Sequence, residues 1–452
     1  MKTKQSTHLL IRAVCFILIM LICVYSVLGI FGVNSKTSFE NTHNFVNEKR
    51  NSLDGVFIGA SNVHAFWQSM FGWKQHGIAV WSYSIDALTA QGVKYLMIEA
   101  RKTQPDALYI ICLNTFKKPT EDTSLKAIHN AVDYMPLSVN KYNLIMALTK
   151  NYSFADRLEF FFPIIRFHSR WDSLGSWVFG ASGYDYKASL HTEGFASGVE
   201  DLSKKYKTYT NMTDVTEDIQ QCLDDLLDYC DENQVNTLFV KVPQAESKTR
   251  QQRMNTLEEY ILGRGYPCLD LMEYPEDYVL DLHSDFYNYL HTNVHGSLKF
   301  SDYLGKYLVE NYHFTDKRGT AGWESWDESA ESYFTDYLAP YYLDFELSLD
   351  NRTEIDSPVL KKLSISGRDI TVSWNAVEGA DGYEVFRKGP GNKHWRSVAS
   401  GDAEMLTYTD TSLKANSKYT YTVVPFQITE EKRLYGFFNV NGINGTTGDD
   451  KQ

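Results

Sequence analysis

Apolar and polar residues follow one pattern in the longer N-terminal part of this chain of 452 residues and a different pattern in its C-terminal part. As far as about residue 315, short apolar runs alternate with longer segments of helical periodicity. The apolar runs predict strands at 53–58, 79–85, 107–113, 237–244 and 266–272. Short apolar strands separated by helices are typical of a parallel sheet with helices on both faces. The pattern therefore predicts an α/β fold in three layers.

The longer segments predict the helices and the limits of this domain. Helices are expected at 89–102, 214–233, 251–262 and 297–311. A short polar stalk precedes the first strand, and we place the α/β domain at residues 36–315. A long aromatic-rich insertion, 119–212, interrupts the alternation, and we expect it to form a lid or wall on the sheet. The connecting segment 316–356 is charged and aromatic, with one predicted helix around 325–338.

From residue 357 to about 447 the pattern changes to a period of two, with turn signals between the runs. This alternation predicts an all-β, immunoglobulin-like sandwich. The stretch 370–388, with Trp374 and Tyr383, and the later run 419–423 resemble a fibronectin type III domain. The resemblance implies a spacer or adhesion unit, so a passive spacer and a glycan-binding role both stay open.

The N-terminal region contains an uncharged, largely apolar run over residues 13–33. As a helix this run is roughly 31 Å long, about the thickness of the hydrocarbon core of a bilayer. Lys2, Lys4 and Arg12 precede it, so the positive-inside rule predicts a cytoplasmic N-terminus and an extracellular remainder. We therefore expect an uncleaved transmembrane anchor in residues 1–35 and a single-pass protein of the bacterial cell membrane. The alternative is a cleaved signal peptide, although no Ala-x-Ala-like site follows the run.

The composition argues against several kinds of partner and site. With 57 acidic against 44 basic residues and a formal net charge of −13, the chain repels phosphate backbones, so nucleic acid is not an expected partner. The six cysteines form no CxxC or Cys/His zinc spacing, and we expect no disulfide framework, no metal and no cofactor. The 30 tyrosines and 9 tryptophans suit stacking on carbohydrate, but they suit β-rich cores equally well.

Polar residues that can support acyl chemistry follow three of the predicted strands. Ser61 comes just after the first strand, where a turn into a helix can expose Oγ and aim the backbone N–H at a bound oxyanion. Asn114 ends the third strand, and its amide can donate to the same oxyanion. Ser84 ends the second strand, where another backbone N–H can join them. Taken singly, Ser61 and Asn114 also fit a turn or a helix cap.

His291 lies in a polar loop just before the last predicted helix of the α/β domain, with Asp285 and Asn288 upstream. A serine needs an imidazole as its base, and the imidazole needs an acceptor that fixes its tautomer. A serine after the first strand and a histidine before the last helix therefore predict a Ser–His site in combination. His295 could chelate zinc with His291, but there is no glutamate between them and no third ligand, so we predict no metal.

For two further sets of residues, a structural role is an alternative to the functional role. Within the insertion, His168, Arg170 and Trp171 could bind a sugar or an anionic headgroup, and the alternative is a packed segment with an ion pair. His64, three residues after Ser61, is expected on the face of a helix rather than as a second base.

Residues 50–315 resemble the SGNH (GDSL-like) hydrolases in the order and spacing of three short motifs. These are Gly59-Ala60-Ser61-Asn62, Leu113-Asn114-Thr115 and Asn288-Tyr289-Leu290-His291. The resemblance extends to the membrane-anchored branch that acylates cell-surface polysaccharides, including relatives of the D-alanyl transfer protein of teichoic acids. That branch often has a stretch similar to Asp285-Phe286-Tyr287…His291-Thr292-Asn293…Gly296.

The resemblance implies a flavodoxin-like fold in three layers, with Ser61 as the nucleophile and His291 as its base. The implied oxyanion-hole donors are the Ser61 N–H, Asn114 and Ser84. The chain departs from the family at one position, because the residue three before the histidine is usually Asp and here is Asn288. An asparagine carbonyl can orient the imidazole but cannot stabilise the imidazolium by charge. Asp285 would supply the carboxylate if the loop folds back.

The leading hypothesis is an exported, membrane-anchored SGNH-type serine esterase or acyltransferase that acts on acyl esters of cell-surface polysaccharide. Its expected partners are a teichoic-acid-like polymer or other cell-surface carbohydrate and, for a transferase, a membrane protein that delivers acyl groups. Hydrolysis and transfer share an acyl-enzyme intermediate, so both stay open. The alternative, which Asn288 favours, is a non-catalytic binding or assembly protein of the cell surface, built on a degenerate SGNH fold.

Overall fold

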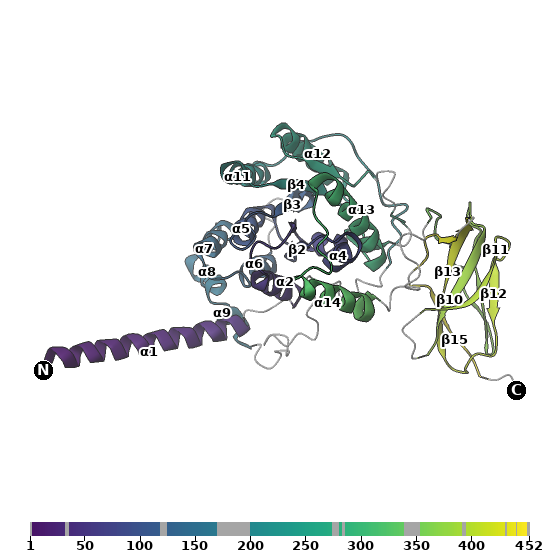
Figure 1. Cartoon of the computed structure of the whole chain (residues 1–452), viewed down its shortest axis with the longest axis horizontal. Helices are drawn as coiled ribbons and strands as arrows, with labels where there is room; N and C mark the ends of the chain where they lie inside the picture. Colours follow the sequence, from purple (N-terminus) through teal and green to yellow (C-terminus); the bar gives the residue numbers. More distant parts are fainter. Residues whose placement is uncertain are drawn as a thin grey trace.

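The computed structural model describes most of the chain. The described residues are 2–31, 36–117, 124–169, 199–273, 280–282, 285–338, 353–390, 395–429, 432–439 and 441–449. Two of the predicted substrate-binding residues, Arg170 and Trp171, lie outside these ranges. Figure 1 shows a sheet surrounded by helices and a separate β-domain toward the C-terminus.

A parallel five-stranded sheet forms the centre of the larger domain. Its strands are β1 (Gly55–Gly59), β2 (Val80–Ser84), β3 (Leu108–Cys112), β4 (Thr237–Lys241) and β5 (Cys268–Asp270). They lie in the order β2-β1-β3-β4-β5, and every pair is parallel. The first four strands are buried along their whole length, which explains their continuous apolar runs. The predicted α/β fold with a parallel sheet is confirmed.

Alternate side chains of each strand point to opposite faces of the sheet, and each face has its own apolar core. Ile58 of β1 packs on one side, in a core that includes residues of α5 (Ala90–Arg101) and α11 (Glu217–Asn233). Phe57 packs on the other side, with residues of α3 (Ser61–Phe66) and α13 (Val294–Tyr312). In Figure 1 the sheet lies between these two groups of helices. The result is three layers.

The described part of the insertion is helical. It comprises α6 (Leu125–Val132), α7 (Val139–Leu148), α8 (Phe154–Phe161) and α9 (Ile164–Phe167). A serine side chain caps the first turn of three of these helices, at Ser124, Ser138 and Ser153. The amide of Asn140 in α7 donates to the Tyr95 carbonyl of α5 at 2.9 Å. The described part of the insertion therefore packs against the helical layer that contains α5.

The segment before the first strand was expected to be a polar stalk, and this prediction is wrong. It forms the helix α2 (Lys36–Asn47). Phe45 is buried and stacks on Tyr83 of β2, with the ring centroids 4.4 Å apart. Asn41 accepts a hydrogen bond from the indole N–H of Trp81 at 3.0 Å. The sequence of this helix is mostly polar, which is why the segment was interpreted as a stalk.

The connecting segment contains the helix that its sequence predicts. This helix is α14 (Glu324–Ser332), and a π-helical turn continues it over Tyr333–Leu338. Trp326 packs on Trp73 of α4 (Ser69–His76), with the ring centroids 5.3 Å apart. This helix and its π-helical turn thus form part of the larger domain's apolar core.

The C-terminal domain consists of antiparallel strands, which confirms the all-β prediction. Its strands are β8 (Ser364–Ser366), β9 (Asp369–Ser373), β10 (Gly382–Lys388), β11 (Arg396–Asp402), β12 (Thr407–Asp410), β13 (Lys418–Ile428), β14 (Arg433–Tyr435) and β15 (Ile443–Thr446). One sheet has the order β11-β10-β13-β14 with β15 paired to β13, and the other has the order β12-β9-β8. Trp374 and Tyr383 meet in the core between the sheets, with ring centroids 5.6 Å apart.

The N-terminal residues form the helix α1 (Lys2–Phe31), which extends away from the α/β domain in Figure 1. Within the described residues, no helix combines the length and the apolarity that crossing a membrane requires. The predicted transmembrane anchor in residues 1–35 and the single-pass location in the cell membrane are therefore wrong. The prediction relied on the length, the apolar composition and the absence of charge of residues 13–33. Part of that run lies outside the described residues, and α1 begins with a polar and basic segment.

Candidate active site

Ser61 is placed at the carboxyl edge of the central strand by an abrupt change from strand to helix. β1 ends at Gly59, Ala60 is still extended with φ −84° and ψ −165°, and α3 begins at Ser61. A Cβ on Gly59 would lie 2.6 Å from Cγ2 of Val63 and 2.7 Å from Cβ of Cys112. Glycine is therefore what allows α3 to turn back so close to β3. Since Ser61 is the first residue of the helix, its backbone N–H has no intrahelical acceptor.

The hairpin before α13 brings a histidine to this serine. The hairpin consists of β6 (Phe286–Asn288) and β7 (His291–Thr292). Oγ of Ser61 lies 2.9 Å from Nε2 of His291, although 230 residues separate them in the chain. Nδ1 of His291 lies 3.0 Å from Oδ1 of Asn288. The structure therefore brings three of the predicted site residues into one chain of hydrogen bonds.

The orientation of the Asn288 amide fixes the tautomer of this histidine. Oδ1 of Asn288 also accepts the backbone N–H groups of Leu290 at 2.8 Å and of His291 at 3.0 Å. Two backbone donors require an oxygen at that position, so the amide NH₂ cannot take its place. The same oxygen accepts the Nδ1–H of the ring. Nε2 therefore carries the lone pair and faces the Ser61 hydroxyl as an acceptor, the arrangement that a general base needs.

Residues after β4 hold the turn of the hairpin in place. The backbone N–H of Ala245 donates to the carbonyl of Tyr289 at 2.8 Å. The side-chain amide of Gln244 donates to the carbonyl of Leu290. Thr292, on the following strand, donates its hydroxyl to the carbonyl of Ala65 in α3. Gln244 was not among the predicted site residues. Its position at the carboxyl end of a strand of the same sheet is the one signal for it in the sequence.

Asn114 is fully buried, and its amide faces the segment after β4. It donates to the carbonyl of Val242 at 2.9 Å and to Oε1 of Gln244 at 3.0 Å, and its oxygen accepts the N–H of Val242 at 2.8 Å. The structure does not bring this amide to Ser61. Asn114 instead supports Gln244, which in turn holds the turn next to His291. In this arrangement Asn114 is a positioning residue.

Ser84 takes part in a second polar cluster. Its Oγ lies 2.9 Å from Nδ1 of His64, and its carbonyl accepts the Asn41 amide at 2.9 Å. In the parallel ladder Ile85 donates to Gly59, so the backbone groups of Ser84 face the other edge of β2, away from β1. Oγ of Ser84 is thus engaged with His64, and neither its side chain nor its backbone N–H is directed at Ser61.

His64 is nearly fully buried and completes that cluster. Nε2 of His64 lies 3.8 Å from Oδ1 of Asp86. Burial lowers the pKa of His64, and the charge of Asp86 offsets part of this effect. His64 faces β2 from α3, three residues after Ser61. The contact between His64 and Ser84 was missed because the register that places Ser84 opposite Gly59 cannot be seen in the sequence.

Asp285 does not supply a carboxylate to His291. It is completely buried, with Oδ1 2.9 Å from Nδ1 of His295 and Oδ2 2.5 Å from Nζ of Lys299. Oδ2 also accepts the backbone N–H of Asp281 at 2.7 Å. Burial alone would raise the pKa of Asp285, but Lys299 and His295 hold it well below its ordinary value. Asp285 is therefore a structural anion at the base of the hairpin.

The remaining predicted residues lie elsewhere. His168 is exposed at the end of α9, where Nδ1 lies 3.1 Å from the carbonyl of Ile165. Its predicted partners, Arg170 and Trp171, lie outside the described residues. Within the part of the chain that the structure describes, no group of three or more His, Cys, Asp or Glu side chains is arranged to hold a metal ion.

No family model matches the chain, and no curated protein matches its sequence. Among solved structures, a β-1,2-glucanase from Parabacteroides distasonis is 20% identical over 22% of this chain and 14% of its own, with a TM-score of 0.18. The pectate lyase Pel3 from Pectobacterium carotovorum is 20% identical over 18% of this chain and 25% of its own, with a TM-score of 0.15. A protein described as FN3tt mut is 22% identical over 21% of this chain and 97% of its own, with a TM-score of 0.16. At such scores these likenesses carry no argument about fold or function.

Proposed function

We propose that this protein is a serine esterase or acyltransferase of the SGNH type, and that it acts on acyl esters of carbohydrate. The observation that carries the proposal is the contact between Oγ of Ser61 and Nε2 of His291 at 2.9 Å, with Asn288 fixing the reactive tautomer. The resemblance of the three motifs to the SGNH hydrolases agrees with this geometry.

In the proposed reaction, Oγ of Ser61 attacks the ester carbonyl carbon while His291 takes the hydroxyl proton on Nε2. The carbonyl oxygen becomes an oxyanion, and the free N–H at the start of α3 is the donor that the geometry favours. The tetrahedral intermediate collapses, His291 gives the proton to the departing sugar hydroxyl, and an acyl-serine remains. Water or a second hydroxyl then attacks the acyl-serine with His291 as base. Water gives hydrolysis, and another hydroxyl gives transfer.

An exposed aromatic ring supports carbohydrate as the substrate class. Tyr289 occupies the turn of the hairpin, between Asn288 and His291, and is 48% exposed. A flat amphipathic ring in the turn of the hairpin that carries His291 suits stacking against a sugar face. The partner in this proposal is therefore an acylated polysaccharide, and a transferase would also need a protein that delivers the acyl group.

The proposal is tested by 4-nitrophenyl acetate hydrolysis and by labelling with a fluorophosphonate, which reacts with activated serines. We expect the wild-type chain to hydrolyse the ester and to accept one label. Ser61→Ala should abolish both, since it removes the attacking oxygen. Ser364→Ala, on the exposed strand β8 of the other domain, is the matched control and should change neither. Hydrolysis that survives Ser61→Ala would contradict the proposal.

One observation favours a second candidate, a binding or assembly protein that has lost catalysis. The acceptor of the Nδ1–H of His291 is the neutral amide of Asn288, which lacks the negative charge by which a carboxylate at this position would stabilise the imidazolium. This candidate predicts that the wild type neither hydrolyses the ester nor takes the fluorophosphonate label. It also predicts that Asn288→Asp restores labelling of Ser61, because the remaining geometry is already in place.

A further inference from the structure

The hairpin that carries His291 is closed at its base by a buried group of charges. Asp285 directly precedes β6, while His295 and Lys299 lie on the first turns of α13, just after β7. Their contacts of 2.9 Å and 2.5 Å to the Asp285 carboxylate therefore join the two ends of the hairpin. A backbone hydrogen bond from Asn293 to the carbonyl of Asp285, at 3.0 Å, closes the same ends. We call Asp285, His295 and Lys299 the base cluster.

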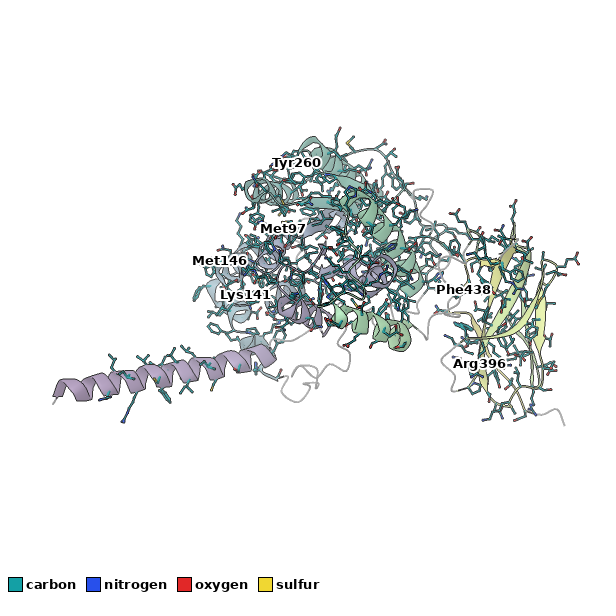
Figure 2. All side chains as sticks on the ribbon, in the orientation of Figure 1. Met97, Lys141, Met146, Tyr260, Arg396 and Phe438 are labelled. Carbon is teal, nitrogen blue, oxygen red and sulfur yellow. The ribbon has the colours of Figure 1, made fainter. Side chains whose placement is uncertain are left out.

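Two aromatic residues of the C-terminal domain cover the base cluster. Nζ of Lys299 lies 3.2 Å from the ring centroid of Phe437, and the ring of His295 lies 5.0 Å from that of Phe438. Each of the two phenylalanines is 6% exposed. Figure 2 places Phe438 on the side of the sandwich that faces the α/β domain. The contact of Lys299 with Phe437 is a cation–π interaction in a site from which water is largely excluded.

The sandwich holds these two rings in place. Phe438 packs with Phe386 of β10, Val424 of β13 and Trp395 in a separate apolar cluster. In addition, the backbone N–H of Phe437 donates to the carbonyl of Ile355, at the end of the connecting segment, at 2.8 Å. The rings are therefore presented from a fixed surface of the domain.

The apolar cluster around Phe438 also contacts the segment of the α/β domain that lies next to the hairpin. Val199 packs against this cluster from the α/β domain. The next residue, Glu200, donates its backbone N–H to the carbonyl of Phe286 in β6 at 2.7 Å. The sandwich thus touches the hairpin both through the base cluster and through the segment that runs beside β6.

We propose that the C-terminal sandwich is a positioning element for His291, in which Phe437 and Phe438 seal the base cluster and so fix the hairpin. Charges attract one another more strongly where water is excluded, so covering the cluster strengthens the contacts that close the hairpin. If the rings leave, water enters and the hairpin loosens. A shift of about 1 Å in a reacting group can cost about 100-fold in rate. The catalytic consequence rests on the proposed function, whereas the docking of the sandwich does not.

The test uses the full chain with Phe437→Ala and Phe438→Ala combined. The matched control is Tyr408→Ala, which removes an aromatic ring from β12 in the other sheet, on the side of the sandwich away from the α/β domain in Figure 1. Amide hydrogen exchange is followed over residues 285–299, and exchange in β1 and β13 reports whether both domains stay folded. We expect faster exchange over 285–299 in the double variant only. Phe437→Tyr, which keeps an aromatic face for Lys299, should exchange like the wild type.

Activity provides the second readout. In the double variant kcat should fall about tenfold or more with KM within twofold of the wild type, because substrate contacts stay while His291 loses its position. Unchanged exchange over 285–299 would overturn the proposal, whatever the activity. Equal loosening in Tyr408→Ala would also overturn it, since the effect would then come from a weakened sandwich. If the wild-type chain has no esterase activity, the proposed function fails, while exchange still decides whether the sandwich fixes the hairpin.

Discussion

The two partners of the Ser61–His291 contact are held by different kinds of interaction. Ser61 follows a strand whose five residues are all buried in apolar cores, and a glycine allows its helix to start there. His291 lies on a short hairpin held by hydrogen bonds, by a buried group of charges and by two rings of another domain. We call these surroundings of Ser61 and of His291 the serine side and the histidine side. The position of Ser61 should therefore be sensitive to changes in side-chain volume, and the position of His291 to changes in charge.

The largest effect is expected when one charge of the base cluster is removed. Lys299→Met leaves the Asp285 carboxylate buried without its ammonium partner, and breaking a buried pair in this way costs about 3–5 kcal/mol of unfolding free energy. The measurement is urea unfolding of the full chain. The control is Lys74→Met, whose ammonium pairs with Glu331 at 3.1 Å with side chains 48% and 65% exposed, and which should cost less than about 1 kcal/mol. Similar losses in the two variants would show that the base cluster has no special role.

The same carboxylate predicts how stability changes in acid. The pKa of Asp285 is lower in the folded protein than in the unfolded chain, so its contribution to stability is present above the unfolded value of about 3.9. That contribution is lost as the pH falls through the lowered folded value. Stability should therefore drop below about pH 4 in the wild type, and this part of the drop should be smaller in Lys299→Met. Urea unfolding between pH 3 and pH 7 measures it, and parallel curves would argue against the assignment.

On the serine side, the test changes the side-chain volume at Gly59. Gly59→Ala places a methyl group 2.6–2.7 Å from atoms of Val63 and Cys112, and such overpacking costs about 1–3 kcal/mol. It should also move α3 and lower ester hydrolysis. Gly263→Ala is the matched control, because no atom lies within 4 Å of the added methyl group at that helical position. The control should be neutral or stabilise by up to about 1 kcal/mol. Equal stability of the two variants would contradict the role assigned to Gly59.

The difference between the two sides also explains what the sequence could predict. The strands and Ser61 were predictable because a buried parallel strand is a local apolar run and its carboxyl end marks the edge of the sheet. His291 and Asn288 were predictable from motif order and spacing. The contacts of Asn114, Ser84 and Asp285 were not predictable, because each residue binds a partner at least ten residues away in the chain, and only the fold brings the two together. For Asn114 the partners are Val242 and Gln244, 128 and 130 residues away.

The smallest predicted change acts directly on the contact between the two sides. In Asn288→Asp the carboxylate keeps the two backbone N–H groups and the Nδ1–H of His291 as donors, so the geometry and the tautomer persist. The new negative charge stabilises the imidazolium that forms as Ser61 attacks. We expect kcat for ester hydrolysis to rise about tenfold, equivalent to about 1.4 kcal/mol, and the acidic limb of the pH–rate profile to move to higher pH.

Asn288→Ala is the matched control for this prediction, because it removes the acceptor altogether and leaves the backbone N–H groups of Leu290 and His291 without that oxygen. Its kcat should fall, since the hairpin loosens and the ring tautomer is no longer fixed. If Asn288→Asp were no faster than the wild type while Asn288→Ala were slower, charge on this side would not limit the reaction. The position of His291 alone would then control the rate, and the histidine side would depend on shape as the serine side does.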